Sequence, residues 1–313
     1  MKKLFHILYI PAVCITFSCN ATPLDPQIAI TNARMSCDKI SQSFKSMKTM
    51  AQVNTAVTSV GTAAGAGATI VGLAKANIDK QIEKLIRDAK QREATSGHTE
   101  MSMDESQDFI EGTVALAEGK TKTAPTQSNL EQKSKNLGNW RTGLLAGNTA
   151  TNIAGTIIAA NNRTDQDLRT QLDKCIRSIH DLQDTKMQAQ IDNADSATLQ
   201  KMDTIINACR DYSTLDVSKI DNLAKGATIS SGVGIAVGAS GTVTSAVANS
   251  DKIRDDNSDT GIAKEKNLNT ASNVLAAGAT VASGVATVFN AQQISTLNKA
   301  YQIATQCSEA LNQ

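Results

Sequence analysis

The sequence predicts an all-α fold: two tandem, long antiparallel helical hairpins that form an Ala/Gly-rich elongated bundle or coiled coil. Apolar residues recur at alternating intervals of three and four, which is the period of packed helices. Two similar segments are each bracketed by cysteines, and aromatic residues make up only 3% of the chain. The scarcity of aromatic residues argues against strand-rich or aromatic-cored folds.

Residues 1–21 have the pattern of a signal peptide. Met1-Lys2-Lys3 is basic, Leu4 to Phe17 is an apolar run too short to span a bilayer, and Ala21 suits a cleavage site. The alternative is lipoprotein processing at Cys19, which Phe17 disfavours because a small residue is expected there. We therefore expect an exported protein of the periplasm, outer envelope or exterior, and the short Lys-Lys leader indicates a bacterium.

Four cysteines remain after removal of the leader, which takes Cys14 and Cys19 with it: Cys37, Cys175, Cys209 and Cys307. An even set in an exported chain predicts two disulfides. Removing Lys2 and Lys3 also leaves 29 basic residues against 30 acidic ones, so the mature chain is nearly neutral. Nothing in this balance indicates a nucleic-acid partner.

An internal repeat organises the rest of the chain. A shift of 172 residues places Cys37 on Cys209, and a shift of 131 matches 133–137 with 264–268; one further residue places Cys175 on Cys307. The predicted segments are an N-terminal segment at 22–36, hairpin 1 at 37–175, a helical connector at 176–208 that bends at 192–197, hairpin 2 at 209–307, and a tail at 308–313. The two shifts differ by 41 because hairpin 1 carries an inserted tip at about 81–132.

The hairpin arms have the spacing of coiled-coil helices. The predicted seam of the first arm is Val53, Val57, Val60, Ala64, Gly67, Val71, Ala74 and Ile78. In the last arm Leu268, Ala271, Leu275, Gly278, Ala282, Val285 and Phe289 form one face, while Val274, Val281 and Val288 form a second, which predicts burial on two sides. Because an antiparallel hairpin returns to its origin, we favour disulfides Cys37–Cys175 and Cys209–Cys307; the two other pairings stay open.

Glycines inside the arms predict close helix approach, since each costs about 1 kcal/mol relative to alanine in a helix interior. Three GxxxG pairs are the expected packing positions: Gly61 with Gly65, Gly143 with Gly147, and Gly234 with Gly238.

The arms also contain long stretches without charge, at 49–74, 142–162, 226–250 and 267–298. Each is long enough to cross a hydrocarbon core of about 30 Å. Their many Thr, Ser, Asn and Gln residues are poor lipid-facing groups. The favoured interpretation is a soluble bundle with an Ala/Gly seam and Thr and Ser on the exposed flank; the alternative is a set of hairpins that insert into a membrane conditionally.

No catalytic, cofactor or metal site is predicted. His98 and His180 are isolated in sequence, and Asp104, Glu105 and Asp108 suit a solvated helix start. Gly119-Lys120-Thr121 lacks the first glycine of a phosphate loop, because position 114 is Val. The lone Trp140 is either a packing residue or a membrane-interface anchor.

We therefore expect no enzyme. The first functional hypothesis is an exported structural or interaction protein, a disulfide-bonded bundle that presents its inserted tip to a protein partner or associates with itself. The alternative is a membrane-active, pore-forming-like protein whose glycine-containing hairpins enter a bilayer.

Overall fold

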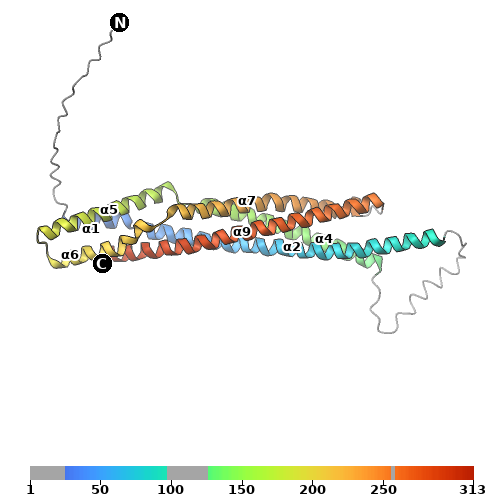
Figure 1. The fold of residues 1–313 in the computed structure, drawn as a ribbon, viewed down its shortest axis with the longest axis horizontal. Coiled ribbons are helices and arrows are strands. Elements are labelled where there is room, and N and C mark those ends of the chain that lie inside the picture. The colour runs from blue at the N-terminus through green and yellow to red at the C-terminus, as the bar shows by residue number, and fades with distance from the viewer. Residues whose placement is uncertain (1–24, 97–125, 255–257) are drawn as a thin grey trace, which may run out of the picture. The chain divides into compact units, whose positions relative to one another are not determined.

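The computed structural model describes residues 25–96, 126–254 and 258–313, and every regular element within them is helical (Figure 1). This confirms the all-α prediction. The predicted leader, including Cys14 and Cys19, and residues 97–125 of the predicted tip lie outside the described residues. The helices are α1 (Pro26–Cys37), α2 (Ile40–Ser96), α4 (Gln127–Asn161), α5 (Gln166–Ile191), α6 (Ser196–Cys209), the 3-10 helix η1 (Arg210–Thr214), α7 (Val217–Ala248), α8 (Asp251–Arg254) and α9 (Asp259–Leu311).

Aspartate caps begin four of these helices, among them α5, where Asp165 accepts a hydrogen bond from the Leu168 amide. Asp25 accepts a hydrogen bond from the Gln27 amide before α1, Asp195 from the Thr198 amide before α6, and Asp216 from the Lys219 amide before α7. The predicted bend at 192–197 is confirmed, because α5 ends at Ile191 and α6 begins at Ser196. Within that bend Asn193 has a left-handed backbone with φ of 54°.

The described chain divides into two compact units. Unit 1 comprises residues up to Lys39, Thr170–Ser213 and Ile303–Gln313, and unit 2 comprises Ile40–Arg169 and Thr214–Gln302. Each unit therefore draws on both predicted hairpins, so the compact units cut across the hairpin boundaries.

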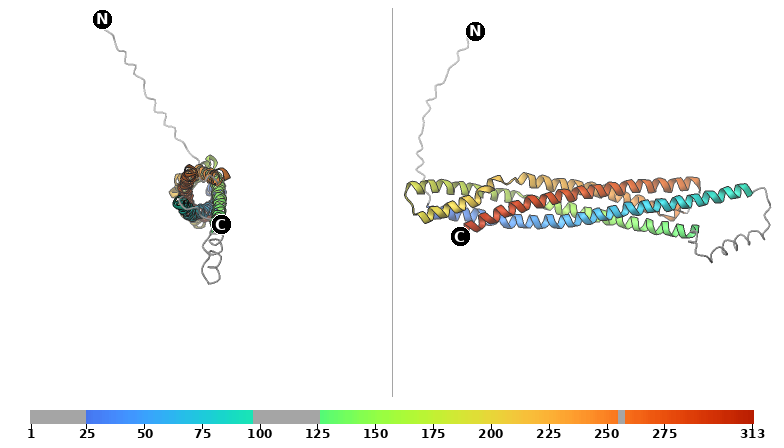
Figure 2. Two further views of the ribbon diagram at one scale, coloured as in Figure 1. Left: turned by 90° about the vertical axis from the view of Figure 1, so that its right-hand side faces the viewer. Right: turned by 60° about the horizontal axis from the view of Figure 1, so that its bottom comes forward.

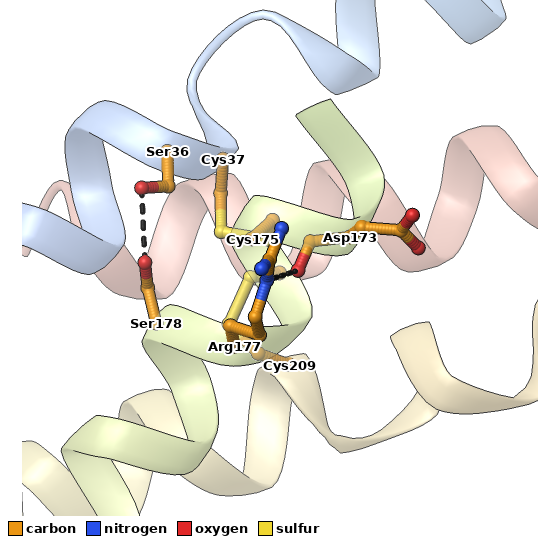
Figure 3. The surroundings of a disulfide bond; sticks show 8 residues. Ser36, Cys37, Asp173, Cys175, Arg177, Ser178 and Cys209 are labelled. Atoms are coloured by element: carbon orange, nitrogen blue, oxygen red, sulfur yellow. Dashed lines mark hydrogen bonds between the residues drawn. A yellow bond between two sulfur atoms is a disulfide. The ribbon is translucent and has the colours of Figure 1, made fainter. Parts of the chain in front are cut away.

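Unit 1 has an ordinary apolar core. Both disulfides lie in it, Cys37–Cys175 and Cys209–Cys307, in the pairing that antiparallel hairpins favour. Beside the first bond the Ser36 and Ser178 hydroxyls lie 2.9 Å apart (Figure 3). Disulfides of this kind are typical of proteins in oxidising compartments. The buried side chains of this unit include Ala29, Ile30, Ala33, Leu172, Ile179, Leu182, Met202, Ile205, Tyr212, Ile303, Ala304 and Leu311.

Unit 2 is a four-helix bundle made of α2, α4, α7 and most of α9, which run alongside one another (Figure 2). These four helices are called the arms below. Packing runs around the bundle from α2 to α4, α7 and α9, and back to α2. The closing contact is a hydrogen bond of 2.9 Å from Asn54 in α2 to Asn290 in α9.

The predicted seam of the first arm is wrong, because α2 is rotated about its axis relative to that expectation. Val53 and Val60 are half exposed or more, and the buried positions are Ala51, Asn54, Thr58, Gly61, Gly65, Ala68, Gly72 and Lys75. The burial predicted on two sides of the last arm is also wrong, since Val274, Val281 and Val288 are all exposed. Apolar periodicity identified the helices and their length but marked the wrong faces.

The buried positions of the arms repeat along the chain. Those of α4 and α9 coincide at the predicted shift of 131, so that Asn148 corresponds to Ala279 and Asn152 to Ser283. Those of α2 and α7 coincide at a shift of 173, one more than the shift that superposes Cys37 on Cys209. The internal duplication stays a prediction, and in the outgoing arms the buried faces do not follow the cysteine alignment.

Candidate functional site

Along the uncharged stretches the interior of unit 2 is mostly small and polar, whereas outside them the unit buries apolar side chains such as Ile40, Phe44 and Ile220. In every arm the buried positions follow a spacing of three and four, and most of them carry glycine, alanine or an uncharged polar side chain. We call this interior the polar seam. Its members include Asn54, Thr58, Gly61 and Gly65 of α2; Asn148, Asn152 and Gly155 of α4; Ser231, Gly234, Gly238, Gly241 and Ser245 of α7; and Asn269, Ser272, Ser283, Asn290 and Gln293 of α9.

Hydrogen bonds between arms connect the polar seam. The Asn290 side chain accepts a hydrogen bond from the Asn54 side-chain amide and donates one of 3.4 Å to the Thr58 hydroxyl. Diagonally across the bundle, the Ser283 hydroxyl lies 3.1 Å from Asn148 Oδ1 and accepts a hydrogen bond of 3.0 Å from Asn152 Nδ2. Such bonds fix the register of the arms, because a buried amide that slips loses its partner.

Several buried polar atoms of the polar seam have no hydrogen-bond partner among the described residues. Asn54 Oδ1, Asn148 Nδ2, Ser231 Oγ and Gln293 Oε1 are buried without a hydrogen-bond partner there. Each such atom costs about 1–3 kcal/mol relative to a satisfied one. The polar seam is therefore a weak source of folding free energy in water, where an apolar core would supply most of it.

Four of the six predicted packing glycines admit polar side chains of neighbouring arms. A Cβ atom on Gly61 would lie 2.5 Å from Thr151 Oγ1, and one on Gly65 would lie 2.6 Å from Thr280 Oγ1. A Cβ atom on Gly234 would likewise come too close to the Asn152 side chain, and one on Gly238 too close to Thr149 Oγ1. The prediction for Gly143 and Gly147 is wrong: both are exposed, and a Cβ on either would meet nothing within 4 Å. The seam of α4 passes through Arg141, Leu145 and Asn148 instead, which turns these two glycines outward.

The outer surface of unit 2 is apolar over the same length. We call it the apolar band: the exposed residues of 53–74 in α2, 143–160 in α4, 229–247 in α7 and 271–291 in α9. All of these exposed residues are Val, Ile, Leu, Ala or Gly except Ser59 and Ser240. At 1.5 Å per residue the α9 section is roughly 30 Å long, about the thickness of a bilayer's hydrocarbon core. By length and composition, the helical stretches Pro26–Gln91, Val217–Ala248 and Asp259–Leu311 could each cross a membrane.

Threonine and serine hydroxyls at the edges of the polar seam and in the apolar band donate hydrogen bonds to the backbone of their own helix. Thr62 donates to the Thr58 carbonyl at 2.9 Å, Thr242 to the Gly238 carbonyl at 2.8 Å, and Ser240 to the Ala236 carbonyl at 2.9 Å. This bond to the carbonyl four residues earlier recurs at Thr55, Thr69, Thr142, Thr149, Thr156, Thr228, Thr244, Thr280 and Thr287. A hydroxyl that donates in this way does not need a hydrogen bond to water. The expected Thr and Ser flank therefore does not make the surface of the bundle strongly polar.

Charged groups cluster where the polar seam ends near 75–79, which we call the tip end of unit 2. Lys75 is 1% exposed and bonds Asp79 at 2.8 Å and Glu265 at 3.0 Å. Arg141 is fully buried and donates to the Asn269 carbonyl at 3.2 Å; its burial lowers the pKa to about 10, while Asp79 acts in the opposite direction. Beside these groups lies a cavity of about 630 Å³, lined by residues that include Asp79, Ser134, Glu265, Lys266, Asn269 and Asn273. Within the cluster Lys75 is paired with two carboxylates, whereas Arg141 Nε and Nη1 have no hydrogen-bond partner among the described residues.

Trp140 does not belong to the core. Its side chain is 70% exposed at the tip edge of the apolar band, where it lines a shallow pocket with Asn139, Gly143 and Leu144. The packing alternative is therefore wrong, and the membrane-interface alternative stays a prediction. His180 is exposed on α5, whereas His98, Asp104, Glu105 and Asp108 lie outside the described residues.

Within the described ranges, no group of three or more His, Cys, Asp or Glu side chains is arranged to hold a metal ion. Comparison with protein-family models, curated proteins and solved structures finds no match to this chain. The candidate site is therefore the surface that the fold itself creates, a polar interior enclosed by an apolar band.

Sequence reasoning found four glycines of the polar seam but missed its polar residues, because it treated apolar side chains as the inward ones. A usable signal was present. Asn148, Asn152 and Gly155, like Asn54, Thr58 and Gly61, recur at the three-and-four spacing while the Val and Ile residues occupy the other faces. Reading the polar period alongside the apolar one would have identified the interior.

Proposed function

We propose that the four arms of unit 2 span a lipid bilayer, and that the chain is an exported, non-enzymatic, membrane-active helical protein. The observation that carries this proposal is the apolar band enclosing the polar seam. A helical bundle stable in water normally has the opposite arrangement, with apolar residues inside and polar residues outside.

The energetics of the two surroundings support the proposal. In water the apolar band leaves a continuous apolar surface exposed, which is unfavourable by about 25 cal/mol per Å² of that area. In a bilayer the same surface meets acyl chains, and helices associate there through small residues and interhelical hydrogen bonds. Glycines such as Gly65 and amides such as Asn152 are groups of this kind.

The broader description, a disulfide-bonded helical bundle compatible with an exported structural protein, holds for either functional hypothesis. Recognition of a protein partner by the inserted tip remains a prediction, since 97–125 lie outside the described residues. What favours insertion is specific to unit 2: the apolar band matches the bilayer in length on all four arms.

A pair of lysine substitutions on one helix tests the proposal. Val281 lies midway along the α9 section of the apolar band and is 66% exposed, while Ser295 is exposed on α9 beyond the band. Lysine at either position should leave the fold in water intact, because both side chains point outward. At the bilayer centre a lysine costs about 2.5–3.5 kcal/mol, so Val281→Lys should reduce vesicle partitioning about a hundredfold.

Partitioning is measured by flotation of purified protein with uncharged phosphatidylcholine vesicles, and circular dichroism confirms that each variant remains helical. Ser295→Lys, the matched control, should float like the unsubstituted protein. Equal flotation of the Val281→Lys variant would contradict the proposal. Absence of flotation by the unsubstituted protein, together with a dimer or larger assembly that Val281→Lys dissociates, would reassign the apolar band to contacts between protein chains.

A further inference from the structure

Four cations follow the apolar band of unit 2 at one of its two edges, two of them at the edge and two about two turns of helix beyond it. The base end is the end where α2 and α7 begin and α4 terminates. There, the first charged residue beyond the uncharged stretch is Lys48 in α2, Arg163 in α4, Lys225 in α7 and Lys299 in α9. We call these four residues the base cations. At the tip end the corresponding residues are Lys75, Arg141, Asp251 and Lys266, of which Lys75 and Arg141 are buried.

Contacts between the arms show that the base edge lies at one level of the bundle. A Cβ on Gly226, next to Lys225, would lie 2.9 Å from the Phe289 ring, and Gln293 donates to the Asn162 carbonyl at 3.1 Å. The apolar band of α9 ends at residue 291, between those two contacts. Lys225 and Arg163 therefore lie at the edge of the band, with Lys48 and Lys299 about two turns of helix further out.

The base cations have no carboxylate partner among the described residues. Lys48 donates to Asn298 Oδ1 at 2.7 Å and lies 5.5 Å from the Tyr301 ring centre, and Arg163 lies 3.5 Å from the Thr228 hydroxyl. The described ion pairs of unit 2 leave Lys225 and Lys299 unpaired.

Most carboxylates near the base end are occupied by other groups. Asp221 binds Thr164 and Arg169, Asp165 accepts a hydrogen bond of 2.6 Å from the Leu168 amide, and Asp216 caps α7. At the tip end Lys75 is neutralised by Asp79 and Glu265, and Lys135 lies 4.0 Å from Asp251, whereas Lys266 is in none of the described ion pairs.

We infer that the base cations bind the phosphates of anionic phospholipid headgroups. This inference rests on the proposed membrane insertion. Lysine and arginine side chains at the edge of an apolar surface extend to the headgroup level while their methylene groups stay in the apolar region. Charge complementarity selects anionic over zwitterionic lipids, and each cation near the surface contributes roughly fivefold in affinity.

The test uses the full chain and a triple variant, R163Q/K225Q/K299Q. All three side chains are exposed, and Lys48 is retained because it also bonds Asn298. The matched control, R34Q/K174Q/R177Q, removes three exposed cations of unit 1, which carries no part of the apolar band. Binding is measured by flotation with phosphatidylcholine vesicles and with vesicles containing phosphatidylglycerol, at fixed ionic strength and with helicity checked by circular dichroism.

The unsubstituted protein should prefer phosphatidylglycerol vesicles. The base variant should lose about a hundredfold in affinity for them and bind phosphatidylcholine unchanged, and the unit 1 control should lose less than about threefold. Equal losses in both variants, or none in the base variant, would overturn the inference. Displacement by inorganic phosphate would assign the base cations to a soluble anion. Insertion that ignores lipid charge refutes this inference alone, whereas absence of insertion in both vesicles refutes the proposed function.

Discussion

Glycine acts at single positions of unit 2 according to the side of the helix on which it lies. Gly65 faces α9 closely enough that a Cβ would lie 3.2 Å from the Thr280 Cα atom, which a side-chain rotation cannot relieve. Gly147 faces open space on the apolar band. Both belong to GxxxG pairs in the sequence, yet only Gly65 serves the packing of two helices.

Alanine at these two positions should therefore act in opposite directions. We expect Gly65→Ala to lower the free energy of unfolding by about 1–3 kcal/mol through overpacking. Gly147→Ala should raise it by about 0.5–1 kcal/mol, because alanine is the better helix former and meets no neighbour. Urea unfolding followed by circular dichroism measures both. A destabilised Gly147→Ala variant would show that this glycine has a packing role after all.

Asp221, at the base end of α7, makes a contribution to folding stability that depends on pH. Its buried carboxylate accepts hydrogen bonds from the Thr164 amide at 2.8 Å and from the side chains of Thr164 and Arg169. Burial acts to raise the pKa of Asp221, but these hydrogen bonds outweigh it and hold the pKa below the ordinary value of 3.8. A carboxyl whose pKa is lowered by folding stabilises the fold above its unfolded pKa, and the stabilisation is lost as the pH falls through the folded value.

Asp221→Asn should therefore cost about 1–3 kcal/mol of stability at pH 7. The difference from the unsubstituted protein should shrink below pH 3.8 and vanish once the aspartate is protonated. Urea titrations at several pH values measure it, and Asp184→Asn on the exposed face of α5 is the control with no expected change. A gap that stays constant with pH would mean that the residue acts through packing and not through its charge.

At the scale of the helices, the two units solve the problem of stability differently. Unit 1 combines short helices, an apolar core and two disulfides that close sequence separations of 138 and 98 residues. Unit 2 has long arms with a polar seam and contains neither disulfide. The disulfides lie in the unit with the shorter helices. The long arms are held together by interhelical hydrogen bonds and by the close packing of small residues.

Removal of either disulfide should weaken unit 1 selectively. In the chain-entropy model each closure of this size contributes about 4–5 kcal/mol. We expect the variants C37S/C175S and C209S/C307S each to lose amide-exchange protection in α1, α6 and the unit 1 part of α5, while the amides of α4 and α7 keep theirs. Hydrogen exchange read by mass spectrometry separates these regions. Loss of protection in α4 and α7 as well would show that the two units unfold together.

At the scale of the whole molecule, near-neutrality hides an uneven distribution of charge. The described residues of unit 2 contain 20 Lys and Arg against 12 Asp and Glu, a net charge of +8. Those of unit 1 contain 7 Lys and Arg against 10 Asp and Glu, a net charge of −3. A chain that is nearly neutral in total can therefore present a cationic surface at the ends of its apolar arms, which the total charge does not reveal.

The sequence by itself determined the helices, the bend at 192–197, the disulfide pairing favoured for antiparallel hairpins and the four uncharged stretches. These features depend on local propensity, on spacing along the chain and on the way a hairpin returns to its start. Only the tertiary structure decided which face of each arm is buried. Val53 is exposed and its neighbour Asn54 is buried, because burial depends on which side chains of the other three arms lie opposite each residue. Asn54 meets Asn290 across the bundle, a contact between residues 236 positions apart that no local pattern in the sequence reveals.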